Sequence, residues 1–233
     1  MPNDKHQHEQ IMSRILFDIF KSSELKNLLA FKGGTACYFL YDLPRFSVDL
    51  DFNLLDSSQA DQVFGRMTEL LKKYGTIKDG FHKRHTLFFL LSYHLKSWNI
   101  KVEINTRAFS HDQYVLQHYL GLPLMVLDKP FITAHKLAAI TDRKHLAMRD
   151  LFDTHYFLKH LWPIDEDTIR ERTGMNIKEY FQKLVTFIGR QKPLNILQGL
   201  GELLDEKQKI WAKEHLVEEL LFYLRAYGEK RGG

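Results

Sequence analysis

An alternation of apolar and polar residues that begins at Val48, in the segment from Val48 to Leu55, limits the possible fold more than any other feature of this chain. Alternation with a period of two is typical of a β-strand that has one apolar face and one polar face. The apolar positions are Val48, Leu50 and Phe52, and the polar positions are Asp49, Asp51 and Asn53. A second run repeats the pattern, with Ile100, Val102 and Ile104 pointing one way and Lys101, Glu103 and Asn105 the other. These runs predict a β-sheet with flanking helices.

The polar face of these strands carries carboxylates. Asp49 and Asp51 are two residues apart, so both side chains project from the same face of their strand. If the second strand lies beside the first, Glu103 adds a third carboxylate. Like charges packed side by side are costly unless a cation neutralises them, and Mg²⁺ (or Mn²⁺) prefers oxygen ligands. We therefore predict that Asp49, Asp51 and Glu103 bind a metal ion and act in catalysis. The alternative for each residue alone is an ordinary solvated surface position.

A glycine pair precedes the first carboxylate strand, in the segment Lys32-Gly33-Gly34-Thr35. Backbone N–H groups at a helix N-terminus can cradle phosphates where no side chain blocks a close approach. Residues 36–41 have helical spacing, so Gly33 and Gly34 are candidates for binding the phosphates of a nucleoside triphosphate (NTP), and Thr35 adds a hydroxyl donor. The alternative for a lone Gly-Gly is a turn.

The rest of the chain divides into two parts. Helices are expected over residues 8–20 and 57–74. A central strand buried on both faces is expected over residues 87–94. A turn at Ser97-Trp98-Asn99 would join this strand to the strand at residues 100–106, so that the two form an antiparallel pair. From Lys129 the pattern is helical almost to the end, with breaks near Pro163, Gly174, Pro193 and Gly201. We predict an α+β protein with a catalytic core at residues 1–125 and an all-helical part at residues 126–233 that completes the active-site cleft.

A second polar group lies in the helical part. Lys136, Arg143 and Asp150 are spaced seven residues apart, so they share one face of an unbroken helix. A break near Asp142 would instead place them on two successive helices that could serve one cleft. The alternative is a surface ladder of salt bridges, which contributes little to stability.

At this point the sequence resembles a family. Gly-Gly-Thr followed by Arg45-x-Ser47-x-Asp49-x-Asp51-Phe52 is similar to the opening of the DNA polymerase β-like nucleotidyltransferases, and more narrowly to the AbiEii/AbiGii toxin family. The resemblance extends to a lysine-bearing helix followed by Arg-Asp-Leu-x-Asp, which here is Lys136 and residues 149–153. It implies that Lys136 binds the NTP phosphates and that Asp150 or Asp153 orients that lysine or acts as a base. Ser47 and Arg45 are candidate phosphate contacts, although Arg45 could equally pair with Asp42.

The resemblance also implies a function. It predicts a magnesium-dependent enzyme that moves an NMP group from an NTP to a hydroxyl of RNA, such as a tRNA 3′ end. The enzyme would be the toxin of a toxin–antitoxin or abortive-infection system, with a possible cognate antitoxin as its partner. Two alternatives stay open: NMP transfer to a protein side chain, and a non-catalytic binding protein. Lys83, Arg84, Lys144 and Arg149 are candidates for an electrostatic track along the RNA, and the alternative for such charges is an ordinary solvated surface.

Bulk composition adds little to this interpretation. The formal net charge is +4, which fits a phosphate-bearing partner but is common among proteins. The single cysteine, Cys37, rules out an intramolecular disulfide and is expected to be a buried thiol. No apolar run is long enough for a membrane span, so we expect a cytoplasmic protein without a membrane partner.

Overall fold

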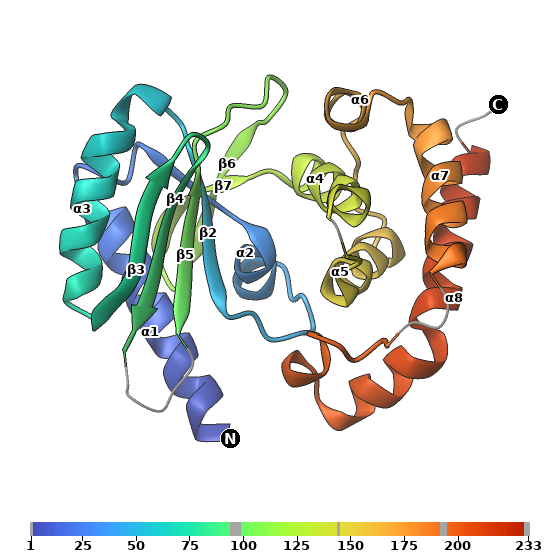
Figure 1. The fold of residues 1–233 in the computed structure, drawn as a ribbon, viewed down its shortest axis with the longest axis horizontal. Helices are drawn as coiled ribbons and strands as arrows, with labels where there is room; N and C mark the ends of the chain where they lie inside the picture. The colour runs from blue at the N-terminus through green and yellow to red at the C-terminus, as the bar shows by residue number, and fades with distance from the viewer. Residues whose placement is uncertain (1, 94–98, 144, 192–194, 231–233) are drawn as a thin grey trace. The chain divides into compact units, whose positions relative to one another are not determined.

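The computed structural model describes residues 2–93, 99–143, 145–191 and 195–230, and these form two compact units (Figure 1). The sheet unit comprises Met1–Asp42, Phe46–Phe109 and Gln113–Leu127. The helical unit comprises Leu43–Arg45, Ser110–Asp112 and Asp128–Gly233. The turn predicted at Ser97 and Trp98, the break at Pro193, and Lys144 of the predicted basic track lie outside the described residues.

The sheet unit is built on one mixed sheet with the strand order β3-β4-β5-β2-β1-β7-β6. Its strands are β1 (Leu29–Lys32), β2 (Asp49–Leu54), β3 (Thr76–Lys83), β4 (Thr86–Ser92), β5 (Ile100–Asn105), β6 (Tyr114–Tyr119) and β7 (Leu122–Leu127). Its helices are α1 (Pro2–Lys21), α2 (Gly33–Leu40) and α3 (Ala60–Lys72), with a short 3₁₀ turn, η1 (Ser57–Gln59), before α3. The predicted α+β fold is confirmed.

One face of the sheet is apolar and forms the core of this unit. Alternate residues of β2, β4 and β5 are buried against α1 and α3, which lie together on one side of the sheet in Figure 1. Phe52 of β2, for example, packs against Phe20 of α1 with ring centroids 6.4 Å apart. Cys37 is buried and forms no disulfide among the described residues, and its burial agrees with the prediction. Because the apolar residues of each strand face this layer, the polar residues of the same strands share the opposite face.

The prediction for β4 was wrong in one respect. The strand lies second from the edge of the sheet, and its residues alternate between buried and half-buried. A run rich in leucine and phenylalanine predicts burial on both faces, but Phe88 and Leu90 lie on the polar face. The predicted antiparallel pairing of this strand with β5 is confirmed. The edges of the sheet are β3, which has an irregular register between Ile77 and Asp79, and β6.

The helical unit contains α4 (Lys129–Asp142), α5 (Met148–Lys159), α6 (Glu166–Thr173), α7 (Ile177–Arg190), η2 (Gly201–Leu203) and α8 (Glu206–Lys230). Asp128 caps α4 and Asn176 caps α7 through their side chains, which accept hydrogen bonds from backbone N–H groups. Gly174 ends α6 in a left-handed conformation with φ of 72°. The leucines of α8 form a packing stripe, and Leu216, Leu220 and Leu224 are fully buried. Among the described residues, no helix is both long and apolar enough to cross a membrane.

Candidate active site

The carboxylates predicted to bind metal lie on two neighbouring strands of the sheet unit. β2 and β5 pair in parallel, with Asp51 directly opposite Glu103 and Asp49 directly opposite Lys101. Register partners on neighbouring strands project from the same face of the sheet. The structure therefore brings Asp49, Asp51 and Glu103 together on the polar face, in the centre of the sheet.

Two lysines that sequence reasoning did not select neutralise part of this charge. Lys101 Nζ lies 3.6 Å from Asp49 Oδ2. Lys32, the last residue of β1, is the register partner of Asp51 on its other side. The alternation of β5 already placed Lys101 on the carboxylate face. The position of Lys32 depends on strand pairing, which the sequence does not reveal.

The surroundings of Asp51 disfavour the charged form of its carboxyl group. Burial raises its pKa, and the negative charges of Asp49 and Glu103 raise it further. Lys32 and Lys101 lower the pKa of Asp51 but offset only part of that increase. A cation bound beside Asp51 would relieve the same repulsion.

Gly33 is required where the chain turns from β1 into α2. Its φ is +79°, a left-handed conformation that costs other residues energy. A Cβ atom placed on Gly33 would lie 2.9 Å from the Cβ of Asp51 and closer still to its carboxylate oxygen Oδ2. The glycine therefore lets the Asp51 carboxylate lie against the start of α2, where backbone N–H groups favour negative charge.

Thr35 and Ser47 fix the approach to β2. The fully buried Thr35 hydroxyl lies 2.8 Å from the Ser47 hydroxyl and also contacts the backbone carbonyl of Asp49. Ser47 is itself 7% exposed. In this structure both hydroxyls hold α2 to the start of the carboxylate strand.

His8 also positions the carboxylate strand, and sequence reasoning missed it. Its ring is fully buried, with Nε2 2.9 Å from the Val48 carbonyl and Nδ1 2.7 Å from the Tyr93 hydroxyl. Because a carbonyl can only accept, Nε2 carries the proton and Nδ1 accepts from Tyr93. Burial lowers the pKa of His8, although the Val48 carbonyl and Asp49 oppose the shift. A neutral His8 thus ties α1 to the residue before Asp49.

The carboxylate set fits a hard divalent cation in its chemistry. Three oxygen-donor side chains share one face, and the absence of a side chain at Gly33 leaves Asp51 unobstructed at the start of α2. Within the described residues, no three histidine, cysteine or acidic side chains already converge closely enough to hold a metal.

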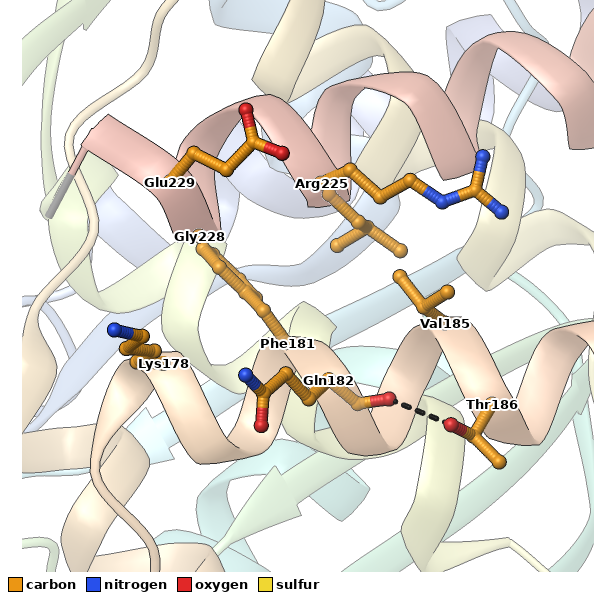
Figure 2. Close-up of a pocket in the computed structure, with 9 residues that line it drawn as sticks. Lys178, Phe181, Gln182, Val185, Thr186, Arg225, Gly228 and Glu229 are labelled. Carbon is orange, nitrogen blue, oxygen red and sulfur yellow. Dashed lines mark hydrogen bonds between the residues drawn. The ribbon is translucent and has the colours of Figure 1, made fainter. Parts of the chain in front are cut away.

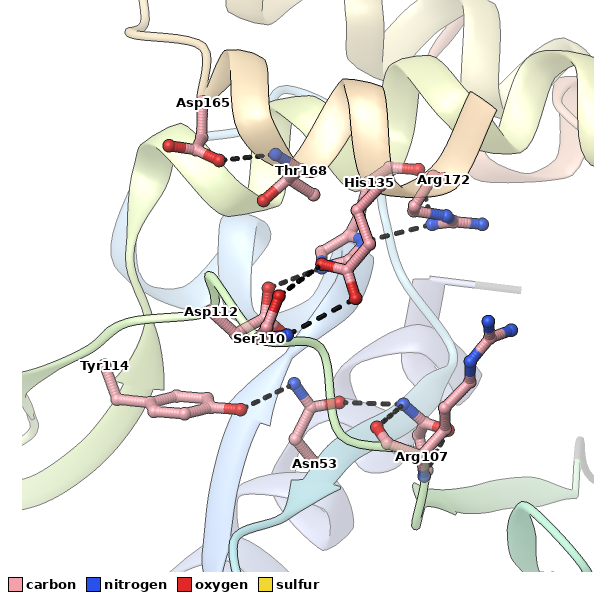
Figure 3. A network of polar contacts seen from close by, with 11 residues as sticks. Asn53, Arg107, Ser110, Asp112, Tyr114, His135, Asp165, Thr168 and Arg172 are labelled. Atoms are coloured by element: carbon pink, nitrogen blue, oxygen red, sulfur yellow. Dashed lines mark hydrogen bonds and ion pairs between the residues drawn. The ribbon is translucent and has the colours of Figure 1, made fainter. Parts of the chain in front are cut away.

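The polar face continues along the same two strands as amides. Asn105 Nδ2 donates to Asn53 Oδ1 across 3.4 Å, and Asn53 Nδ2 donates to the Tyr114 hydroxyl across 3.1 Å (Figure 3). Asn105 also holds the backbone N–H and C=O of Arg107, each at 3.1 Å. The polar face therefore ends in uncharged amide side chains, which these hydrogen bonds hold in place.

The second predicted group forms a buried ionic cluster in the helical unit. The chain breaks at the end of α4, as the alternative with a break near Asp142 predicted, and α4 and α5 bring Lys136 to Asp150 and Asp153. Lys136 Nζ lies 3.0 Å from an oxygen of each carboxylate. Both aspartate side chains are fully buried, so the cluster is not a surface ladder.

Two arginines complete this cluster. Arg45 binds Asp153 through two parallel contacts, Nε to Oδ1 at 2.5 Å and Nη2 to Oδ2 at 2.7 Å, and it is 4% exposed. Arg143 Nε lies 2.8 Å from Asp150 Oδ2. Of the two alternatives for Arg45, phosphate contact or structural pairing, the structure shows a structural partner, but this partner is Asp153 and not Asp42.

The charges in the cluster are mutually stabilised. Burial raises the pKa of Asp153, but Arg45 and Lys136 outweigh it and hold this pKa below its usual range. Burial likewise lowers the pKa of Lys136, but Asp153 and Asp150 outweigh it and raise this pKa. Asp153 is thus a weaker base than an ordinary carboxylate, and it is paired with both Lys136 and Arg45.

A separate clamp ties residues 110–112 to α4 and α6 within the helical unit (Figure 3). His135 Nε2 lies 2.7 Å from Asp112 Oδ1, and Arg172 Nη1 lies 2.9 Å from His135 Nδ1. A guanidinium can only donate, so Nδ1 accepts and Nε2 carries the proton of a neutral imidazole. The arrangement is structural, since both ring nitrogens are engaged.

A hollow of about 520 Å³ lies between α7 and α8 (Figure 2). Its floor is apolar, and its rim includes Lys178, Arg225 and Glu229. Its lining includes one acidic residue, Glu229, and none of the predicted site residues.

Comparisons with known proteins agree with this fold. The chain is 21% identical to JHP933 from Helicobacter pylori, with a TM-score of 0.56 over 97% of this chain and 92% of that one. A Helicobacter pylori protein described as a candidate nucleotidyltransferase matches with 21% identity and a TM-score of 0.56, over 96% of this chain and 94% of that one. No curated protein matches the sequence. The profile of the family described as "Nucleotidyl transferase AbiEii toxin, Type IV TA system" matches residues 14–219, and the chain therefore belongs to this family of nucleotidyltransferase toxins.

Proposed function

We propose that this protein transfers an NMP group from an NTP to an acceptor hydroxyl and releases pyrophosphate. The observation that carries the proposal is the pairing of Asp51 with Glu103 across β2 and β5, with Asp49 on the same face and the Gly33 turn against Asp51. Membership of the AbiEii family supports transferase chemistry and a toxin–antitoxin role.

Asp49, Asp51 and Glu103 would hold the metal, Mg²⁺ or Mn²⁺. When bound, the ion supplies charge neutralisation at the reacting phosphate. The chain's own contribution is to keep the three carboxylates on one face of the sheet, on two directly paired strands.

The reaction balances as a single displacement. The acceptor oxygen forms a bond to the α-phosphorus, and the bond from that phosphorus to the bridging oxygen breaks. The electron pair leaves with pyrophosphate, and the hydroxyl proton passes to water. Backbone N–H groups of Gly33 and Gly34 at the start of α2 bind the departing phosphates. Thr35 and Ser47 support them by holding α2 to β2.

The resemblance assigns Lys136 to the NTP phosphates as well, and Arg45 belongs to the same ionic cluster. Both are held by Asp153, which keeps their charge and orientation fixed, and Asp150 also holds Lys136. We propose that Lys136 stabilises charge in transfer and that Asp150 and Asp153 position it. The acceptor that the family resemblance favours is RNA, such as a tRNA 3′ end, with a cognate antitoxin controlling the toxic outcome.

A transfer assay tests the proposal. The protein is incubated with each α-labelled NTP, Mg²⁺ and total bacterial RNA, in parallel with the Asp49→Asn/Asp51→Asn variant. Asp167→Asn is the matched control, because Asp167 is exposed and pairs only with a neighbouring turn of α6 through Arg170. We expect label on small RNA from the parent and the control, none from the double variant, and none after chelation by EDTA.

Other outcomes favour the two alternatives. Label that is removed by protease but not by nuclease would replace the RNA acceptor with a protein side chain. No label on either, with identical cellular toxicity of the parent and the double variant, would favour a non-catalytic binding protein and refute transfer.

A further inference from the structure

A pair of phenylalanines lies beside the carboxylates on the polar face of the sheet unit. Phe88 of β4 is the register partner of Glu103 on one side and of Phe81 on the other. The rings of Phe81 and Phe88 are stacked, with centroids 4.8 Å apart and planes inclined by 13°. Lys83 Nζ lies 4.2 Å from the centroid of the Phe81 ring.

This aromatic pair is not part of the core. Alternate residues of β4 face α1 and α3, whereas Phe81 and Phe88 face the carboxylate side and are half-buried. Apolar packing alone would favour aromatic rings on the opposite face, where the core lies. Two stacked rings with a lysine against them form the kind of surface on which nucleobases stack.

We propose that Phe81, Phe88 and Lys83, here called the aromatic platform, bind the terminal bases of a single-stranded RNA acceptor. The inference rests on the proposed transfer function. A base stacked on the outer face of Phe88 lies over β5, next to Glu103, and places the hydroxyl of its sugar near the carboxylates. Lys83 contributes positive charge for the RNA backbone.

The strand order favours the acceptor over the NTP as the occupant. The Gly33 turn follows β1, the carboxylates lie on β2 and β5, and the aromatic platform lies on β4 and β3. In an in-line displacement, the attacking and leaving oxygens lie on opposite sides of the phosphorus. If the departing phosphates bind at the Gly33 turn, the acceptor must approach from the side of the aromatic platform.

The test separates an aromatic surface from simple packing. Phe88→Leu removes the ring but keeps an apolar side chain, and Phe88→Tyr keeps the ring. Phe222→Leu is the matched control, because Phe222 is a 63% exposed ring in the helical unit. For each protein we would measure the KM for acceptor RNA at saturating NTP, the KM for NTP, and thermal unfolding. The Kd of a fluorescein-labelled eight-nucleotide single-stranded RNA would be measured without NTP.

We expect Phe88→Leu to raise the RNA KM and the Kd about tenfold, because stacking on one aromatic ring contributes on that order. The KM for NTP stays constant, and Phe88→Tyr and Phe222→Leu behave as the parent. Lys83→Gln should weaken RNA binding and reduce its dependence on salt.

Three results would overturn the platform. These are equal losses in the Leu and Tyr variants, a rise in the KM for NTP in place of that for RNA, and parental affinity in Phe88→Leu. The binding measurement needs no turnover. If the parent labels no RNA, the transfer proposal fails. In that case a tenfold loss of RNA binding in Phe88→Leu would still support the aromatic platform, and an unchanged Kd would overturn the aromatic platform too.

Discussion

Replacement of Gly33 by alanine tests how the chain approaches the carboxylate cluster. The new methyl group meets two obstacles: the φ of +79° and the Asp51 side chain, whose Cβ would lie 2.9 Å away. Gly121, in the turn between β6 and β7, has a φ of +80° but no atom within 4 Å of an added Cβ. Gly121→Ala therefore measures the backbone cost alone.

The two variants differ by the displacement of Asp51. The left-handed conformation costs a residue with a Cβ about 1–2 kcal/mol, and both variants should lose this much free energy of unfolding. Gly33→Ala should lose about 1–3 kcal/mol more, which is typical of an overpacked site. A displacement of a reactive group by about 1 Å lowers rates by about 100-fold, so transfer should fall by this factor in Gly33→Ala and remain at the parental level in Gly121→Ala.

Urea unfolding gives the two free energies, and the labelled-NTP assay gives the rates. Circular dichroism of the folded variants checks that both keep the parental secondary structure. If Gly33→Ala and Gly121→Ala lose the same stability and retain the same activity, the close approach of Asp51 to the start of α2 has no functional importance, and the reasoning is refuted.

Three further predictions follow from the charged groups. Asp51→Asn should abolish transfer yet raise the melting temperature measured without metal, because it removes the cost of burying a carboxylate and the repulsion of that carboxylate by Asp49 and Glu103, which together raise the pKa of Asp51. A lower melting temperature would contradict this. The pKa of Asp153 is lowered on folding, so its contribution to stability is present above the ordinary carboxyl range and is lost as pH falls below about 4. Urea unfolding between about pH 2.5 and 6 should show a weaker acid dependence in Asp153→Asn than in the parent, and parallel curves would count against the ion pairs. Lys136→Met should lower the free energy of unfolding, measured in urea, by about 3–5 kcal/mol, because it leaves two buried carboxylates with less positive charge beside them. The control Lys209→Met removes an ion pair on the surface and should lower the free energy of unfolding by less than about 1 kcal/mol. Similar losses in the two variants would argue that the cluster is solvated.

The alternation of residues predicted the centre of the sheet well. β2 and β5 were identified because apolar and charged residues alternate strictly, which also placed Asp49, Asp51 and Glu103 on one face. Apolar residues alternate less clearly in edge strands than in central ones. Most residues of β3 are exposed, so neither face of this strand needs to be apolar. It therefore escaped prediction, and so did the hairpin of β6 and β7.

Contacts between residues distant in the sequence explain the rest. Arg45 and Asp153 are 108 positions apart, so no local pattern could reveal their pairing. The same holds for His8, which lies 40 positions before Val48. The break after α4 was foreseen only as an alternative, because a heptad spacing is equally compatible with one long helix.

The two edges of the sheet differ in how they resist unwanted strand pairing. β3 carries Lys78, Asp79 and Lys83 and has an irregular register, all of which discourage the addition of another strand. β6 contains no acidic residue, lysine or arginine, and its Leu116 is 59% exposed. Self-association at high concentration should therefore extend the sheet at β6, and a lysine in place of Leu116 would keep the protein dispersed without touching the carboxylates.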